Sequence, residues 1–355
     1  MTATHEIEAQ LRQTAEELLR EKKVDLFLGY EKGSLPFRTA PLFLSQEAQA
    51  ERLAWNPFCS LSLAAYLPAL FAPPASAKQS KPVPTVAVAV RGCDSRAVAA
   101  LIQERQLPRE RLVLVGIPCL GVVDARKAER ALGEHEALGA GEDPQGNIRV
   151  VIEDGSEITL RRDEVLSDAC LECRSPTPSI HDILLGTPVQ GRDPGVARQR
   201  AAEFGAKPAE ARWARFQEMV SRCIRCNACR QACPMCYCRD CLLDQTRTRW
   251  LGAGTERSDV TVYHLLRAFH MAGRCVDCGA CARACPMGID ARLLVRKLNL
   301  DVEDLYGYRA GEATDAPPPL SAFAMDDPQE FLTEPSPASP AVTAGETIDP
   351  GRRSR

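Results

Sequence analysis

Basic residues are not in excess in this 355-residue sequence. The 44 lysines and arginines face 47 aspartates and glutamates, which gives a formal net charge of -3. Surfaces that bind nucleic acids normally carry a basic excess. Aromatic residues make up only 5% of the chain, too few for a platform on which single-stranded bases stack. Both shortages argue against a nucleic-acid partner.

Long hydrophobic runs are also missing. The most apolar stretch, residues 61–71, is interrupted by Pro68 and is too short to cross a bilayer. Residues 1–10 show neither the basic and apolar regions of a secretory signal nor a twin arginine. We therefore expect no membrane insertion and a cytoplasmic location.

Common catalytic and coenzyme motifs are absent as well. No G-x-G-x-x-G follows a predicted strand, so a Rossmann dinucleotide site has no support. We find no Ser-His-Asp triad and no carboxylate pair suited to acid–base work. For His181, near the Cys170-x-x-Cys173 unit, a surface or packing role is favoured, and the alternative is that it tunes or ligates a centre. His264 and His270 are six residues apart, which is not the spacing of a metal pair.

Cysteine, by contrast, is abundant, with 16 residues. In a reducing compartment such a number indicates metal ligation rather than disulfides. Eight of these cysteines form two copies of one pattern, Cys-x2-Cys-x2-Cys-x3-Cys-Pro. The copies are Cys223, Cys226, Cys229 and Cys233, followed by Pro234, and Cys275, Cys278, Cys281 and Cys285, followed by Pro286.

This duplicated spacing predicts two 4Fe-4S clusters. In two-cluster ferredoxins the fourth cysteine of each run ligates the other cluster. One cluster then takes Cys223, Cys226, Cys229 and Cys285, and the other takes Cys275, Cys278, Cys281 and Cys233. A pair of zinc sites is the alternative, but zinc knuckles lack the third cysteine and the trailing proline.

The region before these motifs is predicted to be an α/β domain. Residues 85–90 and 111–117 are continuous apolar runs suited to buried parallel strands, each followed by a turn and a helix. Residues 7–19 and 46–71 have helical patterns, the second broken at Asn56-Pro57, and residues 148–153 and 157–160 predict a hairpin. Asp94 or Ser95, and Ser258 or Asp259, are the predicted helix N-caps.

These patterns predict four segments. An α/β domain with a small, mainly parallel sheet spans residues 1–190, and a polar linker spans residues 191–208. An α-helical dicluster ferredoxin domain spans residues 209–310. Residues 311–355, which hold eight prolines over the last 45 positions, predict a disordered tail.

Cysteines of the α/β domain predict a third 4Fe-4S cluster. Cys93 and Cys119 follow neighbouring strands, at the sheet edge where open α/β sheets bind ligands. Cys170 and Cys173 form a Cys-x-x-Cys unit. Cys59 is a substitute ligand in this scheme, and the alternative is that free cysteines of this kind are core residues.

Three more thiols, Cys236, Cys238 and Cys241, follow the first motif directly. They predict either a fourth metal centre with one further ligand from elsewhere or buried small side chains without a metal. Arginines also crowd the motif loops and are suited to raising reduction potentials or attracting an acidic redox partner. They are Arg222, Arg225, Arg230, Arg274 and Arg283.

Four segments, taken in order, resemble the β-subunit family of deazaflavin-dependent hydrogenases and formate dehydrogenases. They are VDLFLG (24–29), TVAVAVRGC (85–93), LVLVGIPC (112–119) and CLECRSPTPSIHDILLG (170–186). The resemblance covers about residues 20–190 and implies a 4Fe-4S cluster beside an FAD that exchanges hydride with a deazaflavin or nicotinamide. In that family the ferredoxin motifs usually precede this region, whereas here they follow it.

The sequence as a whole favours an iron–sulfur electron-transfer subunit of a cytoplasmic redox complex. Its partners would be other subunits, including a hydrogenase, formate dehydrogenase or heterodisulfide-reductase-like catalytic subunit, and a second redox carrier. One alternative is a flavin-containing oxidoreductase that acts on a deazaflavin or nicotinamide coenzyme. Another is an iron–sulfur sensor or scaffold, although we find no DNA-binding output element.

Overall fold

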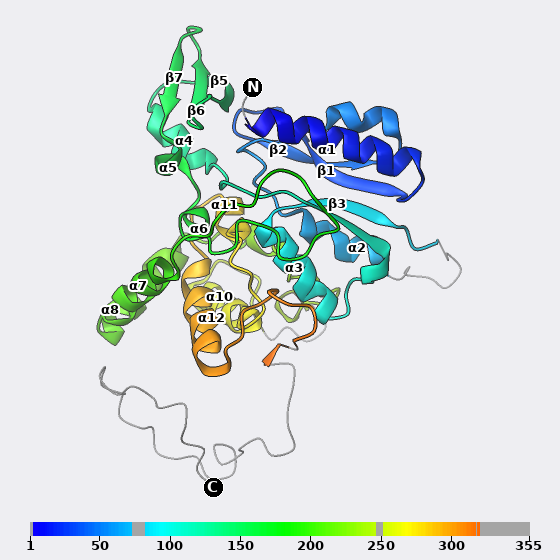
Figure 1. Ribbon diagram of the computed structural model, residues 1–355. Helices are drawn as coiled ribbons and strands as arrows, with labels where there is room; N and C mark the ends of the chain where they lie inside the picture. The colour runs from blue at the N-terminus through cyan, green and yellow to red at the C-terminus, as the bar shows by residue number, and fades with distance from the viewer. Residues whose placement is uncertain (1–2, 73–81, 246–250, 317, 320–355) are drawn as a thin grey trace.

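The N-terminal part is built on a five-stranded sheet with the order β2-β1-β3-β4-β8. The computed structural model describes residues 3–72, 82–245, 251–316 and 318–319 (Figure 1). The strands are β1 (Leu26–Lys32), β2 (Thr39–Leu44), β3 (Val86–Val90), β4 (Leu112–Gly116) and β8 (Ile183–Leu184). Only the β1–β2 pair is antiparallel, which confirms the predicted α/β domain with a mainly parallel sheet.

The central strand β3 shows why the apolar runs form this sheet. All five of its residues are buried, because helices and loops cover both faces of a parallel sheet. The longest helices of this part are α1 (Ala3–Arg20) and α3 (Gly92–Gln103). In the described part of the β2–β3 connection, residues 45–72 and 82–85, the structure has three short helices instead of the long broken helix predicted over residues 46–71. They are η1 (Glu47–Arg52), η2 (Leu63–Tyr66) and α2 (Leu67–Phe71).

A second, three-stranded antiparallel sheet projects from the body of the molecule, at the top of Figure 1. Strands β6 (Ile148–Ile152) and β7 (Glu157–Leu160) form the predicted hairpin. Strand β5 (Ala137–Glu142) was not predicted, because its two glycines hide the strand pattern. One face of this sheet packs on α4 (Ala125–Leu132), and α5 (Arg162–Val165) follows it.

The C-terminal part is helical, as predicted. Its helices are α7 (Pro194–Gly205), α8 (Ala209–Ser221), α9 (Ala228–Gln231), α10 (Arg257–Met271), α11 (Ala280–Ala284) and α12 (Arg292–Tyr306). Helix α7 replaces most of the polar linker expected at residues 191–208, because Asp193 caps it by accepting from the Gly195 amide and Pro194 opens it. No helix among the described residues has the length and apolarity needed to span a membrane.

Two predicted helix starts were wrong by a few residues. Helix α3 begins at Gly92, because Asp94 pairs with Arg91 and the Ser95 hydroxyl donates to the Ile180 carbonyl, which leaves neither side chain free to cap. Helix α10 begins at Arg257. Of the predicted disordered tail, residues 320–355 lie outside the described residues, whereas residues 311–316 lie along α3.

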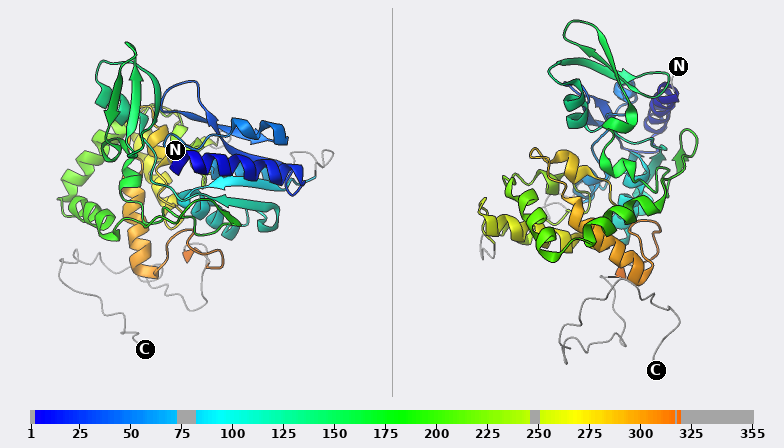
Figure 2. Two further views of the ribbon diagram at one scale, coloured as in Figure 1. Left: turned by 45° about the horizontal axis from the view of Figure 1, so that its top comes forward. Right: turned by 90° about the vertical axis from the view of Figure 1, so that its left-hand side faces the viewer.

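The two parts share one hydrophobic core, and Figure 2 shows α10 and α12 placed against the α/β layer. Met235, Met271, Val276 and Val295 pack with the buried residues of the main sheet. Arg96 of α3, 4% exposed, links the parts by donating to the carbonyls of Ala310 (3.0 and 2.7 Å) and Val276 (3.2 Å). The α/β domain therefore fixes the position of the second cysteine motif.

Replacing Arg96 tests this linkage. We expect Arg96→Met to lower the free energy of unfolding by about 2–4 kcal/mol, because two buried carbonyls lose charge-assisted donors. The exposed Arg111, changed to Met, is the matched control and should change the free energy by about 0.5 kcal/mol or less. Denaturant unfolding of the full chain measures both, and equal stabilities of the two variants would contradict the linkage.

Candidate metal centres

The two cysteine motifs fold into loops with the same unusual backbone. In the first, Arg225 (φ 52°) and Asn227 (φ 60°) flank Cys226; in the second, Asp277 (φ 53°) and Gly279 (φ 72°) flank the equivalent Cys278. Non-glycine residues rarely adopt positive φ, and such strain concentrates at functional sites. The duplicated sequence therefore produces a duplicated loop that wraps three cysteines around one centre.

Backbone amides point at the cysteine sulfurs in both loops. The Arg225 amide donates to Cys223 Sγ (3.4 Å), and the Asp277 amide donates to Cys275 Sγ (3.3 Å). The Ile289 amide donates to Cys285 Sγ (3.4 Å). Such N–H···S bonds stabilise sulfur that carries negative charge and are a principal means of tuning an iron–sulfur cluster.

The fold brings each fourth cysteine to the opposite loop. Cys285 lines one cavity with the first three cysteines of the earlier motif, Cys223, Cys226 and Cys229. Burial, followed by the charges of neighbouring groups that include Cys233, raises the thiol pKa values of Cys275, Cys278 and Cys281, the last to about 11. The structure therefore brings the first predicted set to one cavity and places Cys233 close enough to the second motif to influence the pKa values of its first three cysteines.

A third set of cysteines lines a cavity of about 370 Å³ at the edge of the main sheet. Cys93 lies in the first turn of α3, and Cys119 follows β4. Cys170 lies in α6 (Asp168–Leu171), and Cys173 lies just beyond it. Burial raises the thiol pKa of Cys119 to about 11, and amides of the adjacent loop donate to the sulfurs of Cys119 (3.3 Å) and Cys170 (3.4 Å).

Close backbone contacts hold this third set against the second motif. A Cβ on Gly92 would lie 1.9 Å from the Ser175 carbonyl oxygen, so only glycine lets the chain next to Cys93 approach the loop after Cys173. A Cβ on Gly279 would lie 2.6 Å from the Cβ of Ala169, the neighbour of Cys170. As a result, Cys278 of the second motif also lines the third cavity.

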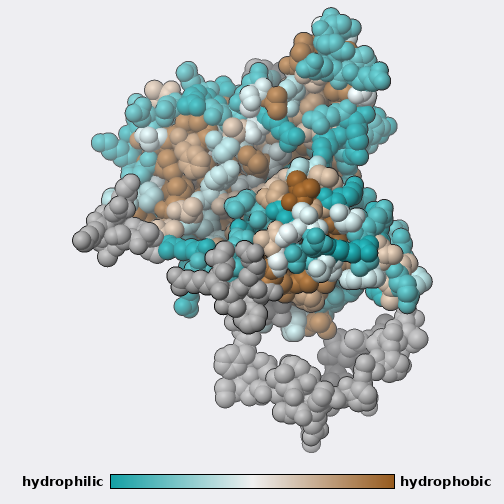
Figure 3. Space-filling model, turned by 180° about the vertical axis from the view of Figure 1, so that it is seen from behind, coloured by the Kyte–Doolittle hydropathy of each residue, from teal (hydrophilic) through white to brown (hydrophobic). Residues whose placement is uncertain are grey.

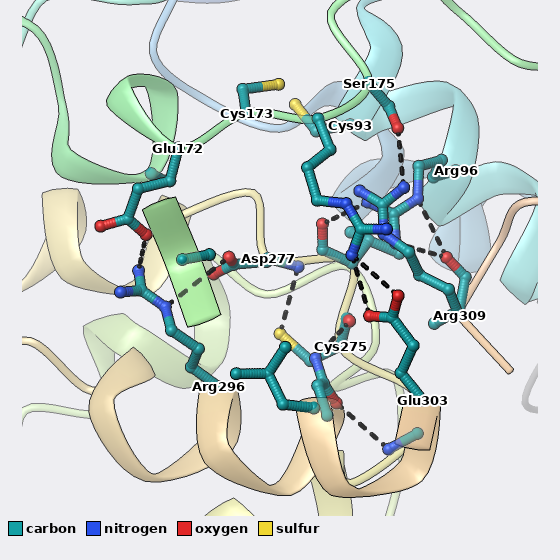
Figure 4. A pocket seen from close by; sticks show the side chains of 18 of the residues that line it. Cys93, Arg96, Glu172, Cys173, Ser175, Cys275, Asp277, Arg296, Glu303 and Arg309 are labelled. Carbon is teal, nitrogen blue, oxygen red and sulfur yellow. Dashed lines mark hydrogen bonds and ion pairs between the residues drawn. The ribbon is translucent and has the colours of Figure 1, made fainter. Parts of the chain in front are cut away.

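Figure 4 shows the seam between these two sets, where Cys93 and Cys173 lie across from Cys275. Ion pairs fill the seam. Arg174 donates to both carboxylate oxygens of Glu303 (3.0 and 2.8 Å), and Arg296 pairs with Glu172 (2.5 Å). These contacts join the residues on both sides of Cys173 to α12 and leave a cavity of only about 80 Å³.

Two arginines face the third cavity. Arg91, 2% exposed, pairs with Asp94 (2.8 Å) and donates to the carbonyls of Cys59 and Leu61. Within the described part of the chain, Arg283 donates only to neutral acceptors, namely the Ser60 carbonyl (2.8 and 3.1 Å), the Cys278 carbonyl (2.9 Å) and the Ser167 hydroxyl (3.2 Å). Arg283 therefore brings a positive charge without a carboxylate partner between the second and third sets.

The surroundings of Arg267 in α10 show whether the dicluster cysteines suit an anionic cofactor. It is 5% exposed, forms no ion pair with a carboxylate among the described residues, and its Nε has no hydrogen-bond partner. Burial alone would lower its pKa, but the charges of Cys281, Cys233, Cys229 and Cys236 raise it overall. A guanidinium buried among thiols fits iron–sulfur clusters, whose thiolate and sulfide ligands are negative.

Neither Arg91 nor Arg267 was among the site residues predicted from the sequence. The sequence does contain a pattern from which Arg267 could have been found. Val260, His264, Ala268 and Met271 follow one another at helical spacing on the buried face of α10, and Arg267 is a charged residue on that same face. His264 is buried beside the first set, and burial lowers its pKa to about 4, whereas His181 is exposed.

Cys59 lies apart from the third cavity. It is 1% exposed and packs in the main core, its thiol contacts the Ala54 carbonyl (3.9 Å), and burial raises its pKa to about 12.

Among the described residues no three His, Cys, Asp or Glu side chains converge on the position of a single metal ion. Ligands of a cubane bind separate irons at its corners, so thiols spread around a cavity suit a cluster better than one ion.

Comparison with known proteins agrees with this architecture. Residues 219–289 match the family described as the 4Fe-4S dicluster domain. The chain is similar to the F420-dependent formate dehydrogenase subunit beta of Methanocaldococcus jannaschii, at 21% identity over 85% of this chain and 91% of the relative. A similar subunit, from F420-dependent formate dehydrogenase 1 of Methanococcus maripaludis, is 23% identical over 66% of this chain and 75% of the relative.

A chain in a structure of the F420-reducing [NiFe] hydrogenase complex of Methanosarcina barkeri also matches. It is 15% identical over 49% of this chain and 64% of that chain, with a TM-score of 0.35. The chain is thus an α/β protein with a 4Fe-4S dicluster domain. It is similar to the β-subunits of two F420-dependent formate dehydrogenases, in agreement with the resemblance seen in its sequence.

Substituting Arg267 tests the electrostatic fit. We expect Arg267→Gln to shift the midpoint potentials of both dicluster clusters to more negative values, by about 59 mV or more, which is tenfold in a one-electron equilibrium. The reason is that the reduced clusters lose a buried positive charge. Redox titration followed by electron paramagnetic resonance measures the shift.

Arg257→Gln, on the exposed first turn of the same helix, is the matched control and should leave both potentials in place. If the two variants have the same potentials, Arg267 has no electrostatic role toward the clusters.

Proposed function

We propose that this chain is the iron–sulfur electron-transfer subunit of a cytoplasmic redox complex. It would carry electrons between a catalytic partner of the formate dehydrogenase, hydrogenase or heterodisulfide-reductase-like type and a second redox carrier. The observation that supports this most directly is the arrangement of twelve cysteines as three adjoining sets. The names of the relatives support a formate dehydrogenase type of complex.

The three proposed ligand sets follow one another through the molecule. The first is Cys223, Cys226, Cys229 and Cys285; the second is Cys233, Cys275, Cys278 and Cys281; the third is Cys93, Cys119, Cys170 and Cys173. The first two exchange their fourth cysteines, so they are neighbours. Cys278 belongs to the second set and lines the third cavity, so the second and third sets are neighbours too.

Bound 4Fe-4S clusters supply one-electron chemistry with little change of geometry. The chain's own residues hold and tune these sites. The thiols must lose their protons to bind metal. Backbone amides at Arg225, Asp277 and Gly121 then donate to the sulfurs, and Arg267 and Arg283 place positive charge between neighbouring sets.

The two ends of this series differ in exposure. Cys226 of the first set is exposed, and Ile224 (53%) and Met287 (37%) beside it are among the exposed large apolar side chains. At the other end, the third cavity is bordered by the exposed Leu120 and by residues 189–192. Each end is therefore a suitable contact for a different redox partner.

Iron content tests the third set. We expect Cys119→Ser to lose about four irons per chain relative to the wild type, one cubane, because one ligand of the third set is removed. Cys59→Ser is the control, since Cys59 is also a buried cysteine of the α/β part but lies outside the cavity. Iron and acid-labile sulfide are measured on anaerobic full-length protein, and an unchanged iron count in Cys119→Ser would remove the third cluster.

Electron transfer itself is tested in the native complex. When the complex is isolated anaerobically through a tag on this chain, formate or hydrogen should bleach the iron–sulfur absorbance and produce the resonance signals of reduced clusters. The same spectra show any flavin, which would favour the coenzyme-reducing alternative. A chain that is colourless, loaded with zinc and silent on reduction would contradict the electron-transfer role.

A further inference from the structure

A fourth group of thiols lies beside the second set without belonging to it. Cys236, Cys238 and Cys241 all line one cavity of about 110 Å³. The end of α10 brings His270 to the same cavity. The cavity therefore gathers three thiols from six consecutive residues and one imidazole from a helix that is distant in sequence.

The charges around this cavity point to an anionic occupant. Its lining includes Arg230, Arg267 and Arg274. Arg230 pairs with Asp244, and Arg274 pairs with Glu104 (2.5 Å). Arg267, 95% buried, has no carboxylate partner among the described residues, and its Nε is without a hydrogen-bond partner. A buried cation of this kind is stabilised by each negative charge that comes close to it, so Arg267 suits an anionic occupant here as well as in the dicluster.

The size and shape of the site favour a cluster over a single ion. A water molecule needs about 10–15 Å³ of such space, so a cavity of about 110 Å³ holds a group of several atoms. The three thiols do not converge on one ion position, as they would around zinc. Imidazole replaces thiolate as an iron ligand in some iron–sulfur clusters, so His270 is chemically suited to complete the set.

We propose that Cys236, Cys238, Cys241 and His270 hold a fourth iron–sulfur cluster. This proposal rests on the proposed function in one respect, because it leaves Cys233 to the neighbouring dicluster site. The Cys236 amide donates to the Cys233 carbonyl (3.1 Å), so the fourth cluster would lie beside the second set as a branch of the series. Cys238 is exposed, and this branch therefore reaches the surface at a third place.

Removing two of the thiols tests the site. In anaerobic full-length protein, Cys238→Ala combined with Cys241→Ala should lower the iron content by about four per chain, one cubane, with acid-labile sulfide falling equally. Cys236 is kept because it contacts Cys233. The resonance signals of the two dicluster clusters, recorded on the same sample, should stay unchanged and show that the fold persists. Cys59→Ala is the matched control and should lose no iron.

His270 provides the second arm, at an exposed position that tolerates substitution. We expect His270→Cys to keep the iron but to change the signal of one cluster alone, because one ligand atom changes from nitrogen to sulfur. The proposal would be overturned if the double variant had the same iron content as the wild type, or if it lost zinc instead of iron. A double variant that also loses the dicluster signals has not folded, and the His270→Cys spectrum then decides: unchanged signals overturn the site.

The outcome is separable from that of the proposed function. The iron content of Cys119→Ser tests whether the third cluster exists, and the spectrum of the wild type tests whether the dicluster exists. Neither measurement involves Cys238, Cys241 or His270.

Discussion

Many thiols of this protein are buried beside arginines that have no carboxylate partner among the described residues. This placement of buried positive charge next to thiols is the constraint on which the rest of the structure depends. Arg267 and Arg96 are nearly inaccessible, and Arg283 is partly buried; none forms an ion pair with a carboxylate among the described residues. A buried guanidinium that lacks an anion costs several kcal/mol. The cysteines close to Arg267 and Arg283 therefore suit negatively charged clusters as ligands, and we expect the same arginines to influence how easily such clusters accept electrons.

The sheet and the ferredoxin loops bring cysteines together in different ways. Parallel strands end at one edge, so β3 and β4 deliver Cys93 and Cys119 to the same place without any local motif. The ferredoxin loops are instead determined locally, by left-handed residues around the second cysteine of each run. The two solutions meet at Gly279, where the absence of a side chain lets the second loop contact the helix that carries Cys170.

Sequence reasoning recovered what depends on local pattern. Duplicated cysteine spacing identified the dicluster domain, and apolar runs identified β3, β4 and the α/β class. It did not find β5, whose glycines conceal a strand that exists because β6 is there to pair with it, nor α7, where a proline and an aspartate start a helix inside a polar stretch. Arg91, Arg267 and the contact between Cys278 and the third cavity depend on tertiary packing, so residue spacing alone did not reveal them.

A shared core between the α/β part and the helical part has a consequence for electron transfer. Two domains joined by a linker would move relative to each other, and the distance between their redox sites would vary. Here Arg96 donates to carbonyls of the helical part, Arg174 holds Glu303 of α12, and Met235 and Val295 pack into the main core. The separation between the second and third sets is thus set by packing, and a constant separation of this kind suits the electron relay that we propose.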